Sequence, residues 1–173
     1  MNKRVRFITH AAIIAAIYAV LTMATWSFAS GAIQVRLSEA LCVLIYFTPA
    51  AVPGIFVGCL IANFMGGMWV DIVFGSLATL IAALITMVIP KKLKYLYPLP
   101  TVLVNTIVIP FVLYFGYGVT SMGNATAMVA VLSILAFTIF VGEAISCYVV
   151  GIPLMNVFKR IWPRISGEDQ YNE

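Results

Sequence analysis

The chain has 173 residues, of which 63% are hydrophobic and only 9% are charged. Soluble domains carry about 25% charged residues, so this composition cannot cover a surface that faces water. The formal net charge of +4 would suit nucleic acid. Basic residues beside apolar segments are more simply explained as topology signals, and we expect no nucleic-acid partner. The composition predicts an all-α, polytopic membrane protein in a lipid bilayer.

Apolar segments make up most of the chain. They run over residues 7–28, 37–50, 52–66, 70–90, 99–117 and 125–158. Segments of about 18 residues or more are long enough to cross ~30 Å of hydrocarbon. The stretch 37–66 is either one very long helix or two short ones. Pro49, Pro53 and Gly54 favour two helices, because proline removes a helical hydrogen-bond donor.

The first apolar segment follows three basic residues, Lys3, Arg4 and Arg6, as the core of a secretory signal peptide does. It extends from Phe7 to about Phe28, which exceeds the roughly 7–15 residues of a typical signal-peptide core. We therefore expect a retained transmembrane helix.

Basic residues form three clusters that limit the number of membrane crossings. The clusters are Lys3, Arg4 and Arg6; Lys91, Lys92 and Lys94; and Lys159, Arg160 and Arg164. The positive-inside rule places all three in the cytoplasm, which requires an even number of crossings between successive clusters. A break near Pro49 gives four crossings and then two. The sequence therefore predicts six transmembrane helices over residues 1–165, both termini cytoplasmic, and a polar C-terminal tail over 166–173.

Four charged side chains near or within the membrane are not explained by topology. They are Arg36, Glu39, Asp71 and Glu143. Glu143 lies near the middle of the last predicted helix, where an ionisable side chain costs from ~2.5 to over ~10 kcal/mol. Two interpretations are open: a carboxylate that lines a ligand cavity, or a structural carboxyl that is hydrogen-bonded between helices.

Arg36 and Glu39 are three residues apart at the outer start of the second predicted helix, on one helical face. A mutual ion pair, worth roughly 0.2–0.5 kcal/mol, and a ligand-binding role are both open. Together with Gln34, they present donors and acceptors at the mouth of the bundle, which suits a small polar solute.

Four further residues complete the candidate substrate-binding set. Asn63 and Asn105 lie in predicted helices, where an amide either joins helices or binds a ligand edge. Asp71 begins the fourth helix, where the helix dipole alone favours an acid. Trp69 lies in the loop before it. The aromatic residues at the outer helix ends are Trp26, Trp69, Tyr114 and Tyr117. They are typical of an interfacial belt, although a planar ligand would also stack on them.

Small residues repeat at a spacing of four on the first helix, among them Ala12, Ala15 and Ala16. In lipid, small residues let another helix approach closely, so internal packing and docking of a partner are both open. The sequence contains no GxxxxGK[ST] loop, no Ser-His-Asp arrangement and no metal-ligand cluster. We expect no enzymatic activity, no cofactor and no metal.

Four motifs carry a resemblance to a known family. They are Gln34-Val35-Arg36-Leu37-Ser38-Glu39-Ala40-Leu41; Pro53-Gly54 with Gly58 and Asn63; Asp71 with Phe74-Gly75-Ser76; and Gly142-Glu143 before Gly151-Ile152-Pro153-Leu154. On these residues the chain resembles, over about residues 5–160, the QueT-type substrate-binding (S) components of energy-coupling factor (ECF) transporters. The Arg-Leu-Ser-Glu segment is fairly specific, whereas the alanine pattern is shared by S components in general.

The resemblance implies uptake of a queuosine precursor, a deazaguanine such as preQ1 or queuine, through the bacterial cytoplasmic membrane. A separate coupling subunit in the membrane would dock on Ala12 and Ala16, with Ala15 beside them, and separate subunits would hydrolyse ATP. Glu39 and Glu143 would divide the ligand's N–H donors and its aminomethyl cation between them, in either order. The alternatives are an S component for another solute, such as a vitamin, and a membrane interaction protein without a transport role.

Overall fold

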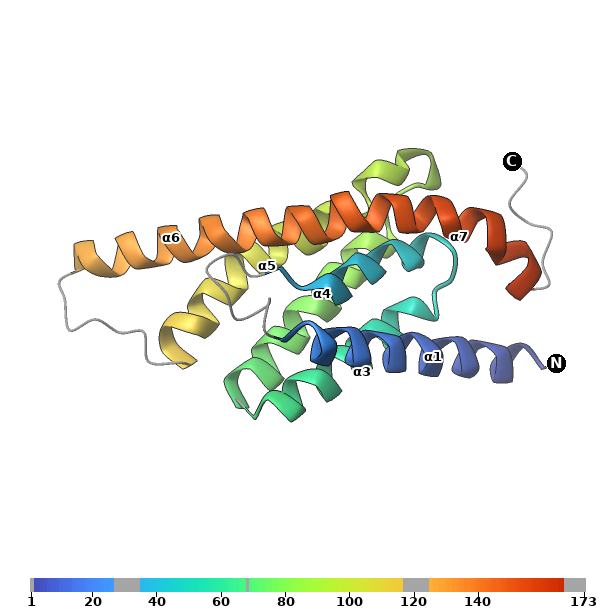
Figure 1. The fold of residues 1–173 in the computed structure, drawn as a ribbon, viewed down its shortest axis with the longest axis horizontal. Coiled ribbons are helices and arrows are strands. Elements are labelled where there is room, and N and C mark those ends of the chain that lie inside the picture. Colours follow the sequence, from blue (N-terminus) through green and yellow to red (C-terminus); the bar gives the residue numbers. More distant parts are fainter. Residues whose placement is uncertain (1, 27–34, 68, 117–124, 167–173) are drawn as a thin grey trace.

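The computed structural model describes residues 2–26, 35–67, 69–116 and 125–166, and these residues form helices and turns with no β-strand among them. Figure 1 shows an elongated bundle in which the helices run roughly along one direction or cross it obliquely. The prediction of an all-α fold is confirmed.

Helical segments follow one another in the predicted order. They are α1 (Lys3–Ala24); η1 (Leu37–Tyr46); α3 (Ala51–Gly66); η2 (Asp71–Gly75) with α4 (Ser76–Met87); η3 (Lys91–Leu96), α5 (Leu99–Phe111) and η4 (Val112–Gly116); and α6 (Ala125–Ala144), η5 (Ile145–Val150) and α7 (Gly151–Ser166). Within them, η1 and η3 are 3-10 helices, and η2, η4 and η5 are π-helical. Three stretches of the described chain, Lys3–Ala24, Lys91–Gly116 and Ala125–Ile165, are long and apolar enough to cross a membrane, and the other helices are shorter and apolar. This pattern is that of a helical membrane bundle.

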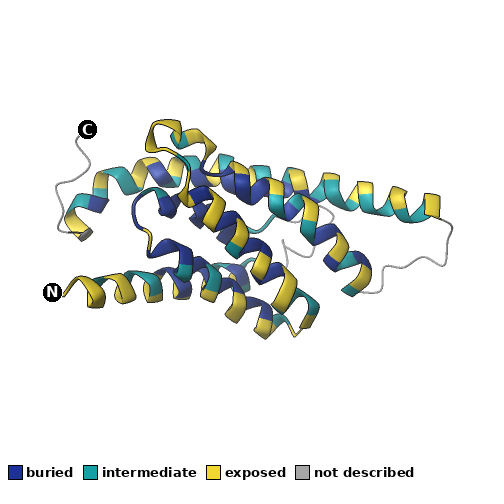
Figure 2. Cartoon of the chain, turned by 180° about the vertical axis from the view of Figure 1, so that it is seen from behind, coloured by how far each residue is buried: buried dark blue, intermediate teal, exposed yellow. Residues whose placement is uncertain are grey.

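The 3-10 helix η1 is the centre of the bundle. Every residue from Ser38 to Ile45 is buried. Helices α1, α3, α4 and α7 and the π-helical stretch η5 all contact it. A helix that is apolar nearly all round is expected to be enclosed by other helices. In Figure 2 the buried residues accordingly lie where helices face one another, and the exposed residues lie on their outer faces.

A turn at Pro49 separates η1 from α3. The helix η1 ends at Tyr46 and α3 begins at Ala51. In the turn, the hydroxyl of Thr48 accepts a hydrogen bond from the backbone N–H of Ala50 at 3.2 Å. The predicted break near Pro49 is therefore confirmed, and the stretch 37–66 is two helices.

Ring contacts join the segments that carry the three basic clusters. The ring centroids of Tyr46 and Tyr97, which follows η3, are 5.3 Å apart, and Lys159 Nζ lies 5.0 Å from the Tyr46 centroid. His10 on α1 packs against Trp162 on α7 with centroids 5.4 Å apart. Figure 1 shows the start of α1 and the end of α7 at one end of the bundle. The first and third clusters thus lie at one end of the bundle, and Tyr46 contacts both Lys159 and the residue Tyr97 that follows the second cluster.

Helices α1 and α3 pack at short distance through glycine. A Cβ atom added at Gly58 would lie 2.7 Å from the carbonyl oxygen of Ala15 and from the Cβ of Tyr18, and one at Gly54 would lie 2.8 Å from the carbonyl oxygen of Ala11. Such small residues let two backbones approach closely in a membrane protein. Gly54 and Gly58 therefore allow α3 to pack closely against α1.

We expect Gly58→Val to destabilise the bundle, because the added side chain would collide with α1. Overpacking of this kind costs about 1–3 kcal/mol, which corresponds to a fall of roughly 2–12 °C in the unfolding temperature of a chain of this size. The cysteines Cys42, Cys59 and Cys147 are buried and free, so a thiol-reactive dye would report unfolding in detergent.

The matched control is Ala12→Val, which adds bulk on the exposed face of α1. It should leave the unfolding temperature unchanged. An equal fall in both variants would show that close packing of α1 on Gly58 is not what stabilises the pair.

Candidate functional site

Three buried polar side chains meet beside η1. Glu39 lies on η1, Asn105 on α5 and Glu143 near the end of α6, and each is only 1% exposed. We call these three residues the acceptor cluster. Their side chains come from three segments that are distant in sequence, so the cluster exists only when the helices are packed together.

Hydrogen bonds and sulfur contacts connect the acceptor cluster. Asn105 Nδ2 donates to Glu143 Oε1 at 2.9 Å. The hydroxyl of Tyr18 on α1 donates to Glu39 Oε1 at 2.5 Å. The thiol of Cys147 lies 3.6 Å from the backbone oxygen of Glu39 and 3.7 Å from Glu143 Oε2. The two carboxyl groups are near enough to interact electrostatically. One connected site therefore contains both candidate carboxyl groups.

Two oxygens in the acceptor cluster are buried without a hydrogen-bond donor among the described residues. They are Glu39 Oε2 and Asn105 Oδ1. Leaving a buried acceptor unsatisfied costs about 1–3 kcal/mol, and native structures contain few such atoms. An amide oxygen and an ionised carboxylate oxygen only accept hydrogen bonds, so a ligand that carries N–H or O–H donors has the chemistry to satisfy both atoms.

A second group of polar residues surrounds Asn63 on α3. Arg36 Nη2 donates to Asn63 Oδ1 at 3.0 Å, and Asn63 Nδ2 lies 3.0 Å from the backbone oxygen of Asp71 and 3.2 Å from Ser76 Oγ. We call Arg36, Asn63, Asp71 and Ser76 the amide cluster. The amide of Asn63 has protein partners on both its oxygen and its nitrogen, so it joins α3 to η2, α4 and the start of η1.

The ion pair considered for Arg36 and Glu39 does not form among the described residues, since Arg36 binds Asn63 and Glu39 binds Tyr18. Arg36 is the N-cap residue of η1 and has an extended backbone, so helical spacing does not align its side chain with that of Glu39. Each has a partner on a different neighbouring helix. Arg36 therefore belongs to the amide cluster and Glu39 to the acceptor cluster.

Two π-helical stretches lie beside these clusters. Asp71 opens η2, and its carboxylate folds back over Gly75, where an added Cβ atom would collide with Asp71 Oδ1. The stretch η5 begins at Ile145, directly after the turn that carries Glu143. π-Helices are rare and are frequent at functional sites. The position of η5 agrees with a site at the acceptor cluster.

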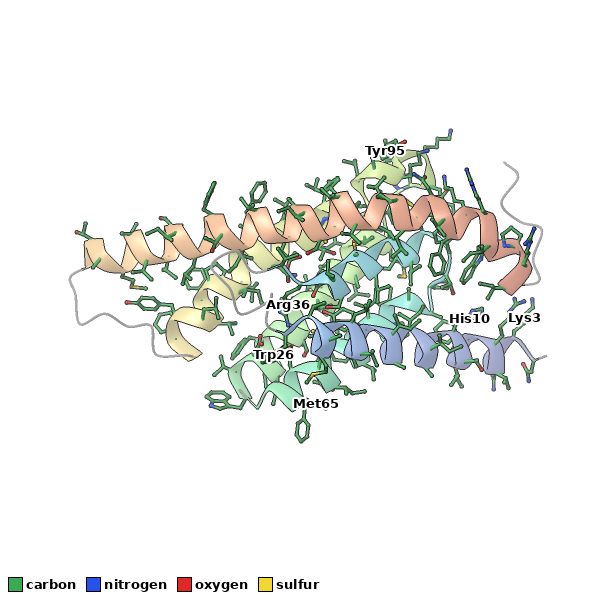
Figure 3. The ribbon with its side chains drawn as sticks, viewed as in Figure 1. Lys3, His10, Trp26, Arg36, Met65 and Tyr95 are labelled. Carbon is green, nitrogen blue, oxygen red and sulfur yellow. The ribbon has the colours of Figure 1, made fainter. Side chains whose placement is uncertain are left out.

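The aromatic candidates do not join either cluster. Trp69 is 69% exposed and lies on the outside of the bundle, whereas Tyr114 on η4 is buried. Figure 3 shows Trp26 and Arg36 near one end of α1 and Lys3 near the other. An exposed tryptophan such as Trp69 is typical of an interfacial belt. Gln34, predicted to bind the solute, lies outside the described residues, and so does Tyr117.

Sequence reasoning missed two residues of the site, Tyr18 and Cys147. Tyr18 is fully buried in the middle of α1. Tyrosine in membrane helices is usually found at the interfaces, so its position in the middle of an apolar run was a usable signal. Cys147 follows Glu143 by one helical turn, but a lone cysteine in an apolar segment is typically a small hydrophobic residue.

The alanines of α1 fall on two sides of the helix. Ala12 and Ala16 are exposed, whereas Ala15 is buried against Gly58. Internal packing therefore accounts for Ala15. A docking role remains available to Ala12 and Ala16.

We expect Asn63→Leu to lower the free energy of unfolding by about 1–3 kcal/mol, toward the upper end because the change removes the partner of the charged Arg36. Asn156→Leu on the exposed surface of α7 is the matched control and should have little effect. Chemical unfolding in detergent, followed by circular dichroism, measures both. Equal stability of the two variants would contradict a structural role for the amide cluster.

Comparison with known proteins identifies the family. The QueT transporter family matches residues 8–160. The chain is also similar to the queuosine precursor transporter QueT of Lactococcus lactis subsp. cremoris (strain MG1363), with 39% identity over 72 residues that cover 40% of this chain and 43% of that protein. The chain thus spans less than half the length of this curated relative. No solved structure matches the chain. Since the family match covers most of the described helices, the chain belongs to the QueT transporter family.

Proposed function

We propose that this chain is the substrate-binding membrane subunit of an ECF-type transporter in the bacterial cytoplasmic membrane, and that it captures a queuosine precursor of the deazaguanine class. The observation that supports the proposal most is the pair of buried acceptors without donors, Glu39 Oε2 and Asn105 Oδ1. A site with this shortage of donors selects for a ligand that brings them. The similarity to a named queuosine precursor transporter points to the same ligand class.

The chemistry of a deazaguanine suits the acceptor cluster. A guanine-like edge presents adjacent N–H donors, which a carboxylate accepts in bidentate fashion, and an aminomethyl group adds a cation that needs an acidic partner. Glu39 and Glu143 together offer two carboxyl groups for these two tasks. The hydrogen bond from Tyr18 orients the Glu39 carboxyl, so that its other oxygen remains for the ligand.

We propose that other subunits supply the energy. The sequence has no phosphate-binding loop of the GxxxxGK[ST] type, so ATP hydrolysis falls to separate ATPase subunits. A coupling subunit in the membrane would dock on α1, where Ala12 and Ala16 are exposed and let a partner helix approach closely.

We expect Glu39→Gln and Glu143→Gln each to weaken deazaguanine binding. Each change replaces one carboxylate oxygen with an N–H donor, which opposes the ligand's own donors. Losing a charged hydrogen bond costs about 1.5–3 kcal/mol, so the Kd should rise roughly 10- to 100-fold. Calorimetry on protein in detergent measures the Kd, and Glu168→Gln in the polar tail is the matched control.

A pair of ligands would assign the two carboxyl groups. One of the two carboxyl groups is expected to bind the aminomethyl cation. The variant that lacks this carboxyl group should lose affinity for preQ1 but not for an analogue with a neutral group in place of the aminomethyl group. If both variants bind deazaguanines as tightly as the unmodified protein, the assignment of the site fails. If a vitamin binds at the acceptor cluster and deazaguanines do not, the proposed substrate class is wrong but the proposed position of the site is right.

We expect Ala12→Trp with Ala16→Trp to abolish copurification with the coupling subunit and to leave solute binding intact. Two indole rings would hold a partner helix away from α1. The matched control places the same pair on α5, as Leu103→Trp with Ile107→Trp, where both side chains are exposed and four residues apart. Loss of solute binding together with docking would indicate misfolding, and retained docking would contradict the proposed surface.

A further inference from the structure

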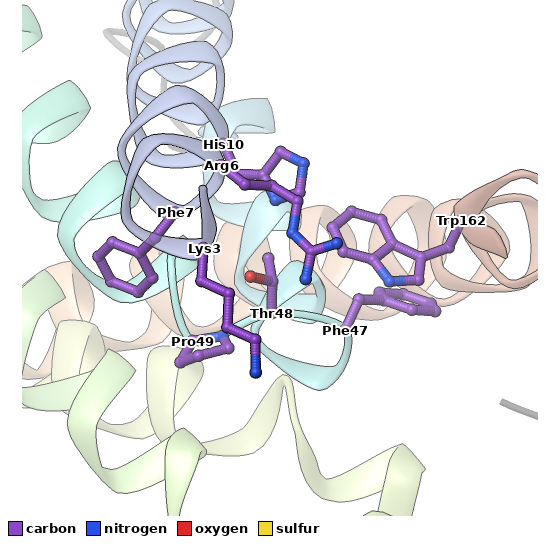
Figure 4. Close-up of a pocket in the computed structure, with 8 residues that line it drawn as sticks. All are labelled: Lys3, Arg6, Phe7, His10, Phe47, Thr48, Pro49 and Trp162. Atoms are coloured by element: carbon purple, nitrogen blue, oxygen red, sulfur yellow. The ribbon is translucent and has the colours of Figure 1, made fainter. Parts of the chain in front are cut away.

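A cavity lies at the end of the bundle where the start of α1 meets the end of α7. It has a volume of about 160 Å³ and opens between the start of α1, the turn before α3 and the end of α7 (Figure 4). Its polar lining residues are Lys3, Arg6, His10 and Thr48, and its aromatic walls include Phe47 and Trp162. The acceptor cluster contributes no residue to this cavity.

The polar lining of the cavity is cationic. Lys3 and Arg6 are three residues apart on α1 and so share a face, and no carboxylate is among the described residues that line the cavity. Figure 4 shows both side chains extending from α1 toward the turn that carries Thr48. The hydroxyl of Thr48 accepts its backbone hydrogen bond from Ala50 and keeps its own proton for donation. These groups together favour an anion with several acceptor oxygens.

A phosphate group fits this lining in chemistry. Guanidinium and ammonium groups are the usual phosphate partners in proteins, the first through parallel N–H donors and the second as a point charge. The neighbouring Phe47 and Trp162 are buried and in ring contact, with centroids 5.7 Å apart. A cavity with both cationic groups and an aromatic wall suits a lipid. The phosphate of the lipid would contact the cationic groups, and its glycerol and chains would contact the aromatic wall.

The position of the cavity indicates where such a phosphate would come from. The start of α1 and the end of α7, which carry two of the basic clusters, lie at this end of the bundle (Figure 1), and the positive-inside rule assigns it to the cytoplasm. The cytoplasmic leaflet carries anionic lipids, and basic pockets between transmembrane helices on that side bind their headgroups. The cytoplasmic orientation of the termini, and not the identity of the transported solute, determines which lipid leaflet the cavity faces.

We propose that this cavity binds the phosphate headgroup of an anionic lipid from the cytoplasmic leaflet. The bound lipid links the start of α1 to α7 and to the turn between η1 and α3. Two residues that topology explained only as cytoplasmic anchors, Lys3 and Arg6, thereby gain a specific ligand. Arg4 lies between them in sequence, does not line the cavity and is exposed.

The test compares variants of equal net charge. The full chain in neutral detergent is titrated with short-chain phosphatidylglycerol, and the saturable rise in unfolding temperature gives a Kd. Lys3→Gln and Arg6→Gln should each raise that Kd about fivefold, as expected for one cation lost near a phosphate. Arg4→Gln removes the same charge outside the cavity and should leave the Kd unchanged.

Three outcomes would overturn the proposal. An equal weakening by Arg4→Gln would show diffuse attraction to the anionic surface instead of a site. Equal stabilisation by phosphatidylcholine would show that the anionic headgroup is not recognised. Saturable binding of inorganic phosphate without binding of phosphatidylglycerol would assign the cavity to a free anion. Lys3→Gln keeps the test valid if Arg6→Gln alone fails to fold, and none of these results depends on solute binding.

Discussion

The burial of Glu39 in an apolar bundle constrains the rest of the structure. A carboxyl group at such a position is costly unless it is hydrogen-bonded. Tyr18 on α1 supplies a donor to one oxygen, and this contact requires α1 to lie directly against η1. The close approach of α1 to α3 at Gly58 places Tyr18 for this contact, because its Cβ packs at that glycine. The geometry of the acceptor cluster therefore depends on the packing of α1 against α3 and η1.

The same constraint separates structural from ligand-binding polar groups. The amide of Asn63 has protein partners on both sides, and it keeps Arg36 in place. Glu39 and Asn105 each retain one oxygen that receives no donor from the described part of the chain. A buried polar group with all its hydrogen bonds made within the protein stabilises the bundle. A buried polar group that lacks a hydrogen bond favours a ligand that supplies the missing partner. This difference, more than burial or charge alone, is why we propose the acceptor cluster as the place for a solute.

Features that depend on short stretches of sequence were predictable. Proline at position 49 predicted the break after η1, apolar length predicted the helices, and the basic clusters predicted a common end, because each effect acts locally. Glu143 and Asn105 were recognisable as polar residues in apolar segments. Their hydrogen bond joins residues 38 apart and depends on how α5 packs against α6, which no local spacing encodes. The partners of Arg36 and Glu39 were likewise decided by neighbouring helices, so the ion pair considered from their spacing does not form.

We propose that donors of a deazaguanine satisfy Glu39 Oε2 and Asn105 Oδ1, which have no donor among the described residues. The most direct measurement is an experimental structure of the protein with preQ1 bound. We expect ring or ammonium nitrogens of the ligand within about 3 Å of Glu39 Oε2 and of Asn105 Oδ1. A ligand bound elsewhere, with both oxygens still buried and without donors, would contradict the account.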